Sequence, residues 1–214
     1  MRAIIAFGVL LMWLVAPSIY AQGDFSRQTP RFYFGIDLQS TSSNFSKYET
    51  EYDDPLGVTI PIIIDRSFPS DGEVSGLALK FGYHFTNFLA AEVQYVKVQE
   101  VELDDGTTFN VDFLSSAFLR FDLPFRSVVP YVLAGGSYMN WRYEEPVLAG
   151  GTIEIRETSF APAFGGGVEI YGGEYTAFNI NWTRYMFDPN GINHDAISFG
   201  IVHWFEFPSL YRRF

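Results

Sequence analysis

The chain has 214 residues and no cysteine, and its 25 acidic and 14 basic residues give a formal net charge of −11 at pH 7. This charge argues against nucleic acid as a partner, and the lack of cysteine argues against a lipid-modified N-terminal cysteine. Aromatic residues make up 18% of the chain, more than one soluble core needs, so we expect apolar side chains on the outside of the fold.

The first residues have the order of features that is typical of a secretory signal peptide. Arg2 supplies a positive charge, the run from Ala3 to Val15 is apolar throughout, and a small residue, Ala21, follows a helix-breaking Pro17. The apolar run is shorter than the roughly 20 residues that a membrane-spanning helix needs, so removal is favoured over retention as an anchor. We therefore predict a signal peptide at 1–21 and one mature domain at 22–214.

From residue 31 onward, apolar and polar residues alternate with a period of two, which is typical of strands with two different faces. In one such run Leu77, Leu79 and Phe81 alternate with Ala78 and Lys80. We predict eight strands, at about 31–40, 75–85, 88–97, 109–123, 130–141, 158–171, 175–187 and 196–205. Their connections alternate between tight turns and longer polar loops, of which the first covers 41–74.

Short turns on one rim and long loops on the other are the layout of outer-membrane barrels. An even number of strands places both chain ends on the short-turn side, which would be the periplasm. The fold class that this pattern predicts is all-β: a transmembrane, antiparallel, up-and-down β-barrel of about eight strands. A soluble lipocalin-like barrel also alternates, but its apolar face points inward.

The polar face of the strands favours the membrane barrel, because it combines small residues with charges of both signs. An eight-stranded barrel has an interior just wide enough to be filled by side chains, and Ala161, Ala163, Gly165 and Gly167 suit such a lumen. We predict that charged residues of this face form a network in the lumen, and that it blocks the barrel rather than opening as a gated ion path. The predicted lumen charges are Asp37, Lys80, Glu92, Arg120, Asp122 and Glu169.

Aromatic residues gather at the strand ends, where the two girdles of an outer-membrane barrel meet the membrane interfaces. At the short-turn rim they are Tyr83, Phe85, Phe88, Phe121, Phe125, Tyr131, Tyr171, Tyr175 and Phe205. Near the opposite rim they are Tyr95, Phe109, Tyr138, Trp141, Phe160, Tyr185 and Phe187.

The segments 82–92 (GYHFTNFLAAE), 130–136 (PYVLAGG), 166–170 (GGVEI) and 198–205 (SFGIVHWF) resemble the small outer-membrane β-barrel superfamily, which includes OmpA-like transmembrane domains and porin-family barrels. The resemblance implies integral residence in the Gram-negative outer membrane, with lipid, lipopolysaccharide and the outer-membrane assembly machinery as partners. Only about nine residues follow the last predicted strand, so peptidoglycan anchoring is not expected. Either Phe205 or Phe214 would present the terminal aromatic assembly signal.

Three functions are compatible with such a barrel. The leading hypothesis is a non-enzymatic structural or surface-interaction role through the outer loops, where 58–64 is either part of a hairpin or a contact surface for an unknown partner. A narrow, low-conductance pore and a lipid A-modifying enzyme are the alternatives. For the enzyme, His84 falls at the periplasmic rim, His194 in the last outer loop and His203 on the lipid face, without a Ser-His motif. We expect no catalytic, cofactor-binding or metal-binding residues. Arg184 would bind either a lipopolysaccharide phosphate or a carboxylate at the rim.

Overall fold

The computed structural model describes residues 31–53, 59–69, 76–102, 106–123, 125, 127–147, 151–186 and 192–205. The predicted signal peptide at 1–21 and the terminal Phe214 lie outside these residues, so cleavage after Ala21 and the choice of assembly signal stay predictions. Phe187 of the predicted outer girdle also lies outside them. None of the described residues belongs to a helix long and apolar enough to cross a membrane.

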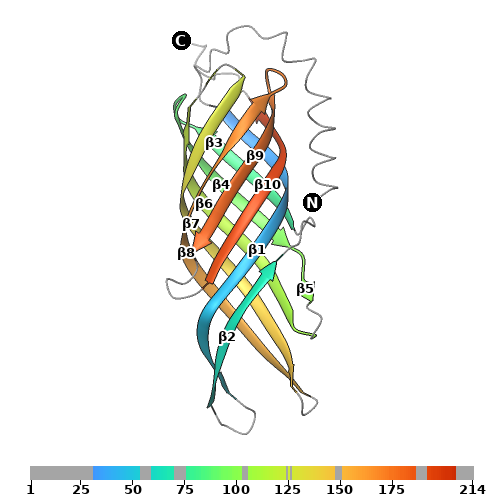
Figure 1. The fold of residues 1–214 in the computed structure, drawn as a ribbon. Helices are drawn as coiled ribbons and strands as arrows, with labels where there is room; N and C mark the ends of the chain where they lie inside the picture. Colours follow the sequence, from blue (N-terminus) through green and yellow to red (C-terminus); the bar gives the residue numbers. More distant parts are fainter. Residues whose placement is uncertain are drawn as a thin grey trace.

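The described residues form β-strands that are antiparallel to their neighbours (Figure 1). In chain order they are β1 (Arg31–Asp53), β2 (Thr59–Pro69), β3 (Gly76–His84), β4 (Leu89–Val98), β5 (Val101–Glu102), β6 (Thr108–Asp122), β7 (Val128–Val147), β8 (Gly151–Tyr171), β9 (Thr176–Met186) and β10 (Ile192–Phe205).

Eight of these strands close into a barrel in the order β1-β3-β4-β6-β7-β8-β9-β10. The ring is completed by β1 and β10, which pair from Phe32 opposite Phe205 to Phe45 opposite Ile192. Closure gives the backbone groups of the wall partners within the sheet, which a membrane interior requires because it offers no water. The predicted eight-stranded antiparallel barrel is therefore confirmed. The two remaining strands are additions, since β2 pairs with the outer part of β1 and β5 pairs with β6.

The outer strand ends differ from the prediction. β1 continues to Asp53 and pairs with β2 from Ser42 opposite Pro69 to Asp53 opposite Thr59, so much of the predicted loop 41–74 is a hairpin. The β7–β8 ladder likewise continues to Val147 opposite Gly151, where a loop at 142–157 was predicted. In the β7–β8 extension apolar residues such as Tyr143 and Ile155 face inward and charged residues such as Glu154 face outward. This is the reverse of the pattern in the barrel wall, where the outward face is apolar.

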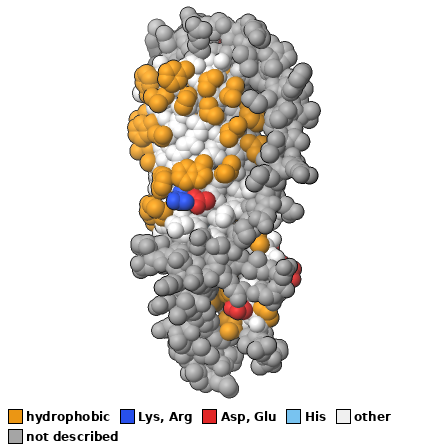
Figure 2. Space-filling model, viewed as in Figure 1, with side chains coloured by type: hydrophobic (Ala, Val, Ile, Leu, Met, Phe, Trp, Pro, Cys, Tyr) orange, Lys and Arg blue, Asp and Glu red, His pale blue; other side chains and the backbone are white. Residues whose placement is uncertain are grey.

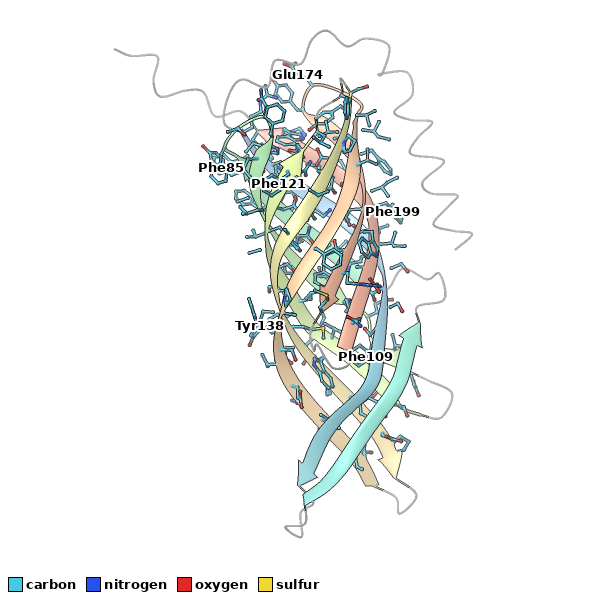
Figure 3. The ribbon with its side chains drawn as sticks, turned by 60° about the vertical axis from the view of Figure 1, so that its left-hand side comes forward. Phe85, Phe109, Phe121, Tyr138, Glu174 and Phe199 are labelled. Atoms are coloured by element: carbon cyan, nitrogen blue, oxygen red, sulfur yellow. The ribbon has the colours of Figure 1, made fainter. Side chains whose placement is uncertain are left out.

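The outer surface of the barrel carries a belt of apolar side chains. For example, the apolar side chain of Leu119 is 51% exposed and that of Val132 is 55% exposed. Figure 2 shows this belt as a broad band of orange side chains over the wall. Several predicted girdle residues lie on it, and Phe85, Phe121 and Tyr138 are among the side chains labelled in Figure 3. An exposed apolar surface this wide fits a lipid solvent rather than water.

Five predicted girdle aromatics are instead buried inside the barrel, so their assignment was wrong. A β-bulge between Val111 and Phe113 adds Asp112 to β6 and reverses the parity beyond it, which turns Phe109 inward. The other four lie at alternate strand positions whose side chains point into the barrel: Tyr131, Trp141, Tyr171 and Tyr185.

Candidate functional site: a charge network in the barrel lumen

The structure places all six predicted lumen charges inside the barrel, on five strands. Each of these residues is at most 2% exposed. Period-two alternation accounts for their direction, because a strand in the wall turns every second side chain toward the lumen. They are Asp37 on β1, Lys80 on β3, Glu92 on β4, Arg120 and Asp122 on β6, and Glu169 on β8.

Arg120 is the centre of one half of the network. Its Nη1 lies 2.5 Å from Glu169 Oε1 and 3.5 Å from Glu92 Oε2, and its Nε donates to Asp122 Oδ1 at 2.8 Å. The guanidinium also lies over the ring of Tyr131, with Cζ 3.9 Å from the ring centroid. One cation thus links carboxylates from β4, β6 and β8 across the lumen, with an aromatic face beneath it.

Asp37 is the centre of the other half. Its Oδ2 forms an ion pair with Lys80 Nζ and accepts hydrogen bonds from Asn179 Nδ2 at 3.0 Å and from Ser198 Oγ at 2.8 Å. Tyr131 joins the two halves, because its hydroxyl donates to Asn179 Oδ1 at 2.5 Å while its ring carries Arg120.

Further polar side chains hydrogen-bond to three of the carboxylates. His84 Nε2 pairs with Asp122 Oδ2, and the Tyr33 hydroxyl donates to Glu92. Glu92 also accepts from Gln94 Nε2 at 2.6 Å, and the Tyr171 hydroxyl donates to Glu169 Oε2 at 3.0 Å. Four carboxylates therefore face two permanent cations and one histidine, and each carboxylate has at least one charged or ionisable partner. Buried charges persist when they are paired and hydrogen-bonded in this way.

Buried apolar and aromatic side chains pack around the network. Toward the short-turn rim, Tyr33, Val129, Tyr171 and Trp204 belong to one buried cluster. Toward the outer rim a larger cluster includes Leu114, Met139, Trp141 and Tyr143. Both clusters contact the network directly, since Tyr33 and Tyr171 donate to its carboxylates and Tyr131 of the larger cluster carries Arg120 on its ring.

Gly82 lies against the ring of Tyr33, and a side chain at position 82 would occupy the same space as that ring. A Cβ on Gly82 would lie 2.1 Å from Tyr33 Cζ, inside the ring's van der Waals surface, whereas a Cβ on Gly173 would meet no atom within 4 Å. We expect Gly82→Ala to lower the free energy of unfolding by about 1–3 kcal/mol through overpacking, and Gly173→Ala to change it by less than about 0.5 kcal/mol. Urea unfolding of both variants in lipid vesicles measures the difference. Equal stability of the two variants would contradict this assignment of Gly82.

The three histidines have different surroundings in the barrel. His194 was predicted in an outer loop, which is wrong: it lies in β10, is fully buried, and has Nδ1 2.6 Å from Ser43 Oγ. Asp195 points to the other face, where its carboxylate accepts two hydrogen bonds of 2.8 Å from Arg184. The sequence left open a phosphate or a carboxylate as the partner of Arg184, and in the structure the partner is the carboxylate of Asp195. His203 is exposed on the outer face, as predicted. No cluster of metal-binding side chains occurs within the described part of the chain.

Some members of the network were not predicted. Tyr33, Tyr131, Asn179 and Ser198 lie on the inward parity of their strands, and this parity was the signal that could have identified them. No local pattern singles out Asn179 and Ser198, because their role depends on contact with Asp37, which is far away in the sequence.

A closed antiparallel barrel with an apolar belt outside and a filled, charged lumen defines an integral outer-membrane β-barrel protein. The family comparison gives the same result: the chain belongs to the outer membrane protein beta-barrel domain family, whose model matches residues 7–205. Its location is the outer membrane of a Gram-negative cell, as predicted. No curated protein matches the sequence.

Several solved structures share the fold at low sequence identity. Neisserial surface protein A is 14% identical with a TM-score of 0.52, covering 82% of this chain and 99% of its own. Ail, the attachment invasion locus protein of Yersinia pestis, is 13% identical with a TM-score of 0.51, covering 82% and 97%. The N-terminal β-barrel domain of Pseudomonas aeruginosa OprF is 12% identical with a TM-score of 0.50, covering 83% and 98%. These similarities establish the shared fold.

Proposed function

We propose that this protein is a non-enzymatic membrane scaffold whose outer β-ribbons make contacts at the cell surface. The observation that carries the proposal is the continuation of the β7–β8 ladder beyond Tyr138 and Phe160, which are paired and exposed at the outer edge of the belt. From there the ladder continues to Val147 and Gly151. At about 3.3 Å per residue, this segment is roughly 30 Å long. We call residues 139–147 and 151–159 the β7–β8 ribbon.

The outward face of the β7–β8 ribbon is charged, in contrast to the belt. Arg142 lies 3.4 Å from Glu144, and Arg156 lies 2.5 Å from Glu154. Such a surface is suited to water and to polar partners rather than to lipid. Figure 1 shows the β7–β8 ribbon and the β1–β2 hairpin projecting from the same end of the barrel, opposite the short turns.

Ordered ribbons at this end support a role in recognition, because they present a preformed surface without the entropy cost of ordering a loop. Ail is named for attachment and invasion, and its structure was determined with a heparin analogue. We extend a role in surface attachment, without a specific ligand, to the present chain. The filled lumen favours this role over the pore, and the separation of His194 from Asp195 favours it over the enzyme.

Replacing residues 145–153, the tip of the β7–β8 ribbon, by a short turn tests the proposal. Because the β6–β7 ladder, which ends at Glu144, and the buried Trp141 and Tyr143 are untouched, we expect the variant to insert and fold normally while attachment to host-cell and abiotic surfaces falls at least about tenfold, which corresponds to roughly 1.4 kcal/mol. Cell-adhesion counts with matched surface expression provide the measurement. Unchanged adhesion would overturn the role of the ribbon. Steady single-channel currents from the intact protein in a planar bilayer would favour the pore instead.

A further inference from the structure

A groove opens on the outward face of the barrel at the outer ends of β3 and β4. Its volume is about 530 Å³, which falls within the roughly 300–1,000 Å³ that is typical of small-molecule sites. It lies beside an interruption along β1, because the β1–β3 ladder ends at Gln39 and the β1–β2 ladder begins at Ser42. Its walls include Leu38, Leu77, Lys97, Glu100 and Asn110.

The groove spans the outer edge of the apolar belt. Leu77 is 45% exposed and lies between Leu38 on β1 and Lys97 on β4. Tyr95, two residues before Lys97 on the same outward face, belongs to the predicted outer girdle and is 47% exposed. Interfacial aromatic rings lie at the level of lipid headgroups. The leucines therefore face acyl chains, and the polar end of the groove faces headgroups.

The polar end of the groove offers both hydrogen-bond donors and acceptors. Lys97 Nζ donates to Asp112 O at 2.8 Å, and its other two N–H groups have no hydrogen bond to the described residues. Asn110 Nδ2 donates to Glu100 Oε2 at 3.1 Å, whereas Asn110 Oδ1 is buried without a hydrogen-bond partner in the described part of the chain. The ammonium can thus bind an anionic group, while Glu100 and the amide oxygen can accept from a cationic one.

We propose that this groove binds one zwitterionic phospholipid, with an acyl chain along Leu38 and Leu77 and a headgroup that carries both a phosphate and a primary amine. The phosphate pairs with Lys97, and the ammonium donates to Glu100 and to Asn110 Oδ1. Phosphatidylethanolamine has this combination of groups. The inference goes beyond the proposed surface role, and neither depends on the other.

The carboxylate in the groove selects against anionic lipids. Glu100 repels a headgroup with one net negative charge, such as phosphatidylglycerol, and it repels a lipid with several phosphates more strongly. A free phosphate ion has no chain to fill the apolar end of the groove. A zwitterionic headgroup is neutral overall and satisfies Lys97 and Glu100 together.

The first test uses residues 22–214 in nanodiscs that contain phosphatidylethanolamine and phosphatidylglycerol in equal amounts. Native mass spectrometry after mild detergent extraction identifies and counts the retained lipids. Leu77→Trp fills the apolar end of the groove. Leu79→Trp is the matched control, because Leu79 is exposed on the same face of β3 and is not among the described residues that line the groove. We expect Leu77→Trp to retain phosphatidylethanolamine at least about tenfold less than the parent, and Leu79→Trp to stay within about twofold.

Substitutions at the polar end test the headgroup contacts separately. The parent is expected to prefer phosphatidylethanolamine about fivefold, and Glu100→Gln to reduce this preference below about twofold. Lys97→Met is expected to lower retention of both lipids about fivefold, whereas Lys97→Arg keeps the charge and stays within about twofold of the parent. These variants leave the apolar wall intact, so they test the site even if Leu77→Trp does not fold.

A phosphatidylethanolamine with a spin label on its acyl chain, added at one molecule per protein, locates the bound lipid. The methyl resonances of Leu38 and Leu77 are expected to broaden more than those of Leu119, which lies elsewhere on the belt. Equal broadening at the three leucines, or equal lipid retention by the two tryptophan variants, would overturn the inference. The absence of a headgroup preference in the parent would also overturn it, as would stronger retention of lipopolysaccharide than of phosphatidylethanolamine from nanodiscs that contain both.

Discussion

Replacing Arg120 by methionine is expected to lower the free energy of unfolding by about 3–5 kcal/mol, because it leaves buried carboxylates without their cation. Glu92, Asp122 and Glu169 all contact this guanidinium in the lumen. Methionine retains much of the side-chain volume, so the loss of stability reflects the missing charge rather than a new cavity. Reversible urea unfolding from lipid vesicles, followed by tryptophan fluorescence, measures the change.

Arg184 provides the control for this experiment, since it also pairs with a carboxylate but lies at the partly exposed outer rim. Arg184→Met is expected to change the unfolding free energy by less than about 1 kcal/mol, as for other surface ion pairs. A second variant, Arg120→Met combined with Glu169→Gln, should recover part of the loss because one uncompensated charge is removed. A loss below 1 kcal/mol for Arg120→Met alone would show that the network does not stabilise the barrel.

Placing an arginine in the middle of the apolar belt is the second change with a large expected effect. Leu119 is 51% exposed and lies opposite Ala134, midway along the lipid-facing residues of β6 and β7. Leu119→Arg is expected to destabilise the barrel by about 2–4 kcal/mol, because the charge then lies near the bilayer midplane. The same urea titration in vesicles gives this value.

Depth in the membrane distinguishes this effect from a general intolerance of arginine. Phe160 is 75% exposed at the outer edge of the belt, where a guanidinium reaches the interface. Phe160→Arg should therefore destabilise the barrel by no more than about 1 kcal/mol. Equal effects at both positions would mean that the belt does not span the hydrocarbon layer as proposed.

Alternation predicted the barrel wall well, because each of its strands has one face in lipid and one in the lumen. The same alternation predicts that Lys80, Glu92 and Arg120 point inward, and each is at most 2% exposed in the structure. Which charges meet depends on strand order and register, and these are set by contacts between distant segments. Asp37 and Ser198 are 161 positions apart, and no local pattern relates one to the other.

The errors have physical causes of the same kind. A single bulge at Asp112 reversed the face of Phe109, and a bulge leaves no trace in a period-two pattern except at the point where it occurs. Trp141 and Tyr185 were read as interfacial because aromatic rings suit a membrane boundary, although their parity points inward. The strand extension at 142–157 was missed because its outward face is charged rather than apolar, as at Glu154 and Arg156, so it lacks the outward apolar face of the barrel wall.

The position of Asp37 has a consequence for the order of folding. Its carboxylate contacts Lys80 on β3, Asn179 on β9 and Ser198 on β10, so the groups that neutralise and solvate it come from both ends of the chain. During insertion, Lys80 can reach Asp37 once β1 and β3 pair, whereas Asn179 and Ser198 reach it only when β1 and β10 join. Closure of the barrel and formation of these two hydrogen bonds are therefore one step, and a chain that stops before β9 would leave the barrel open and Asp37 without both donors.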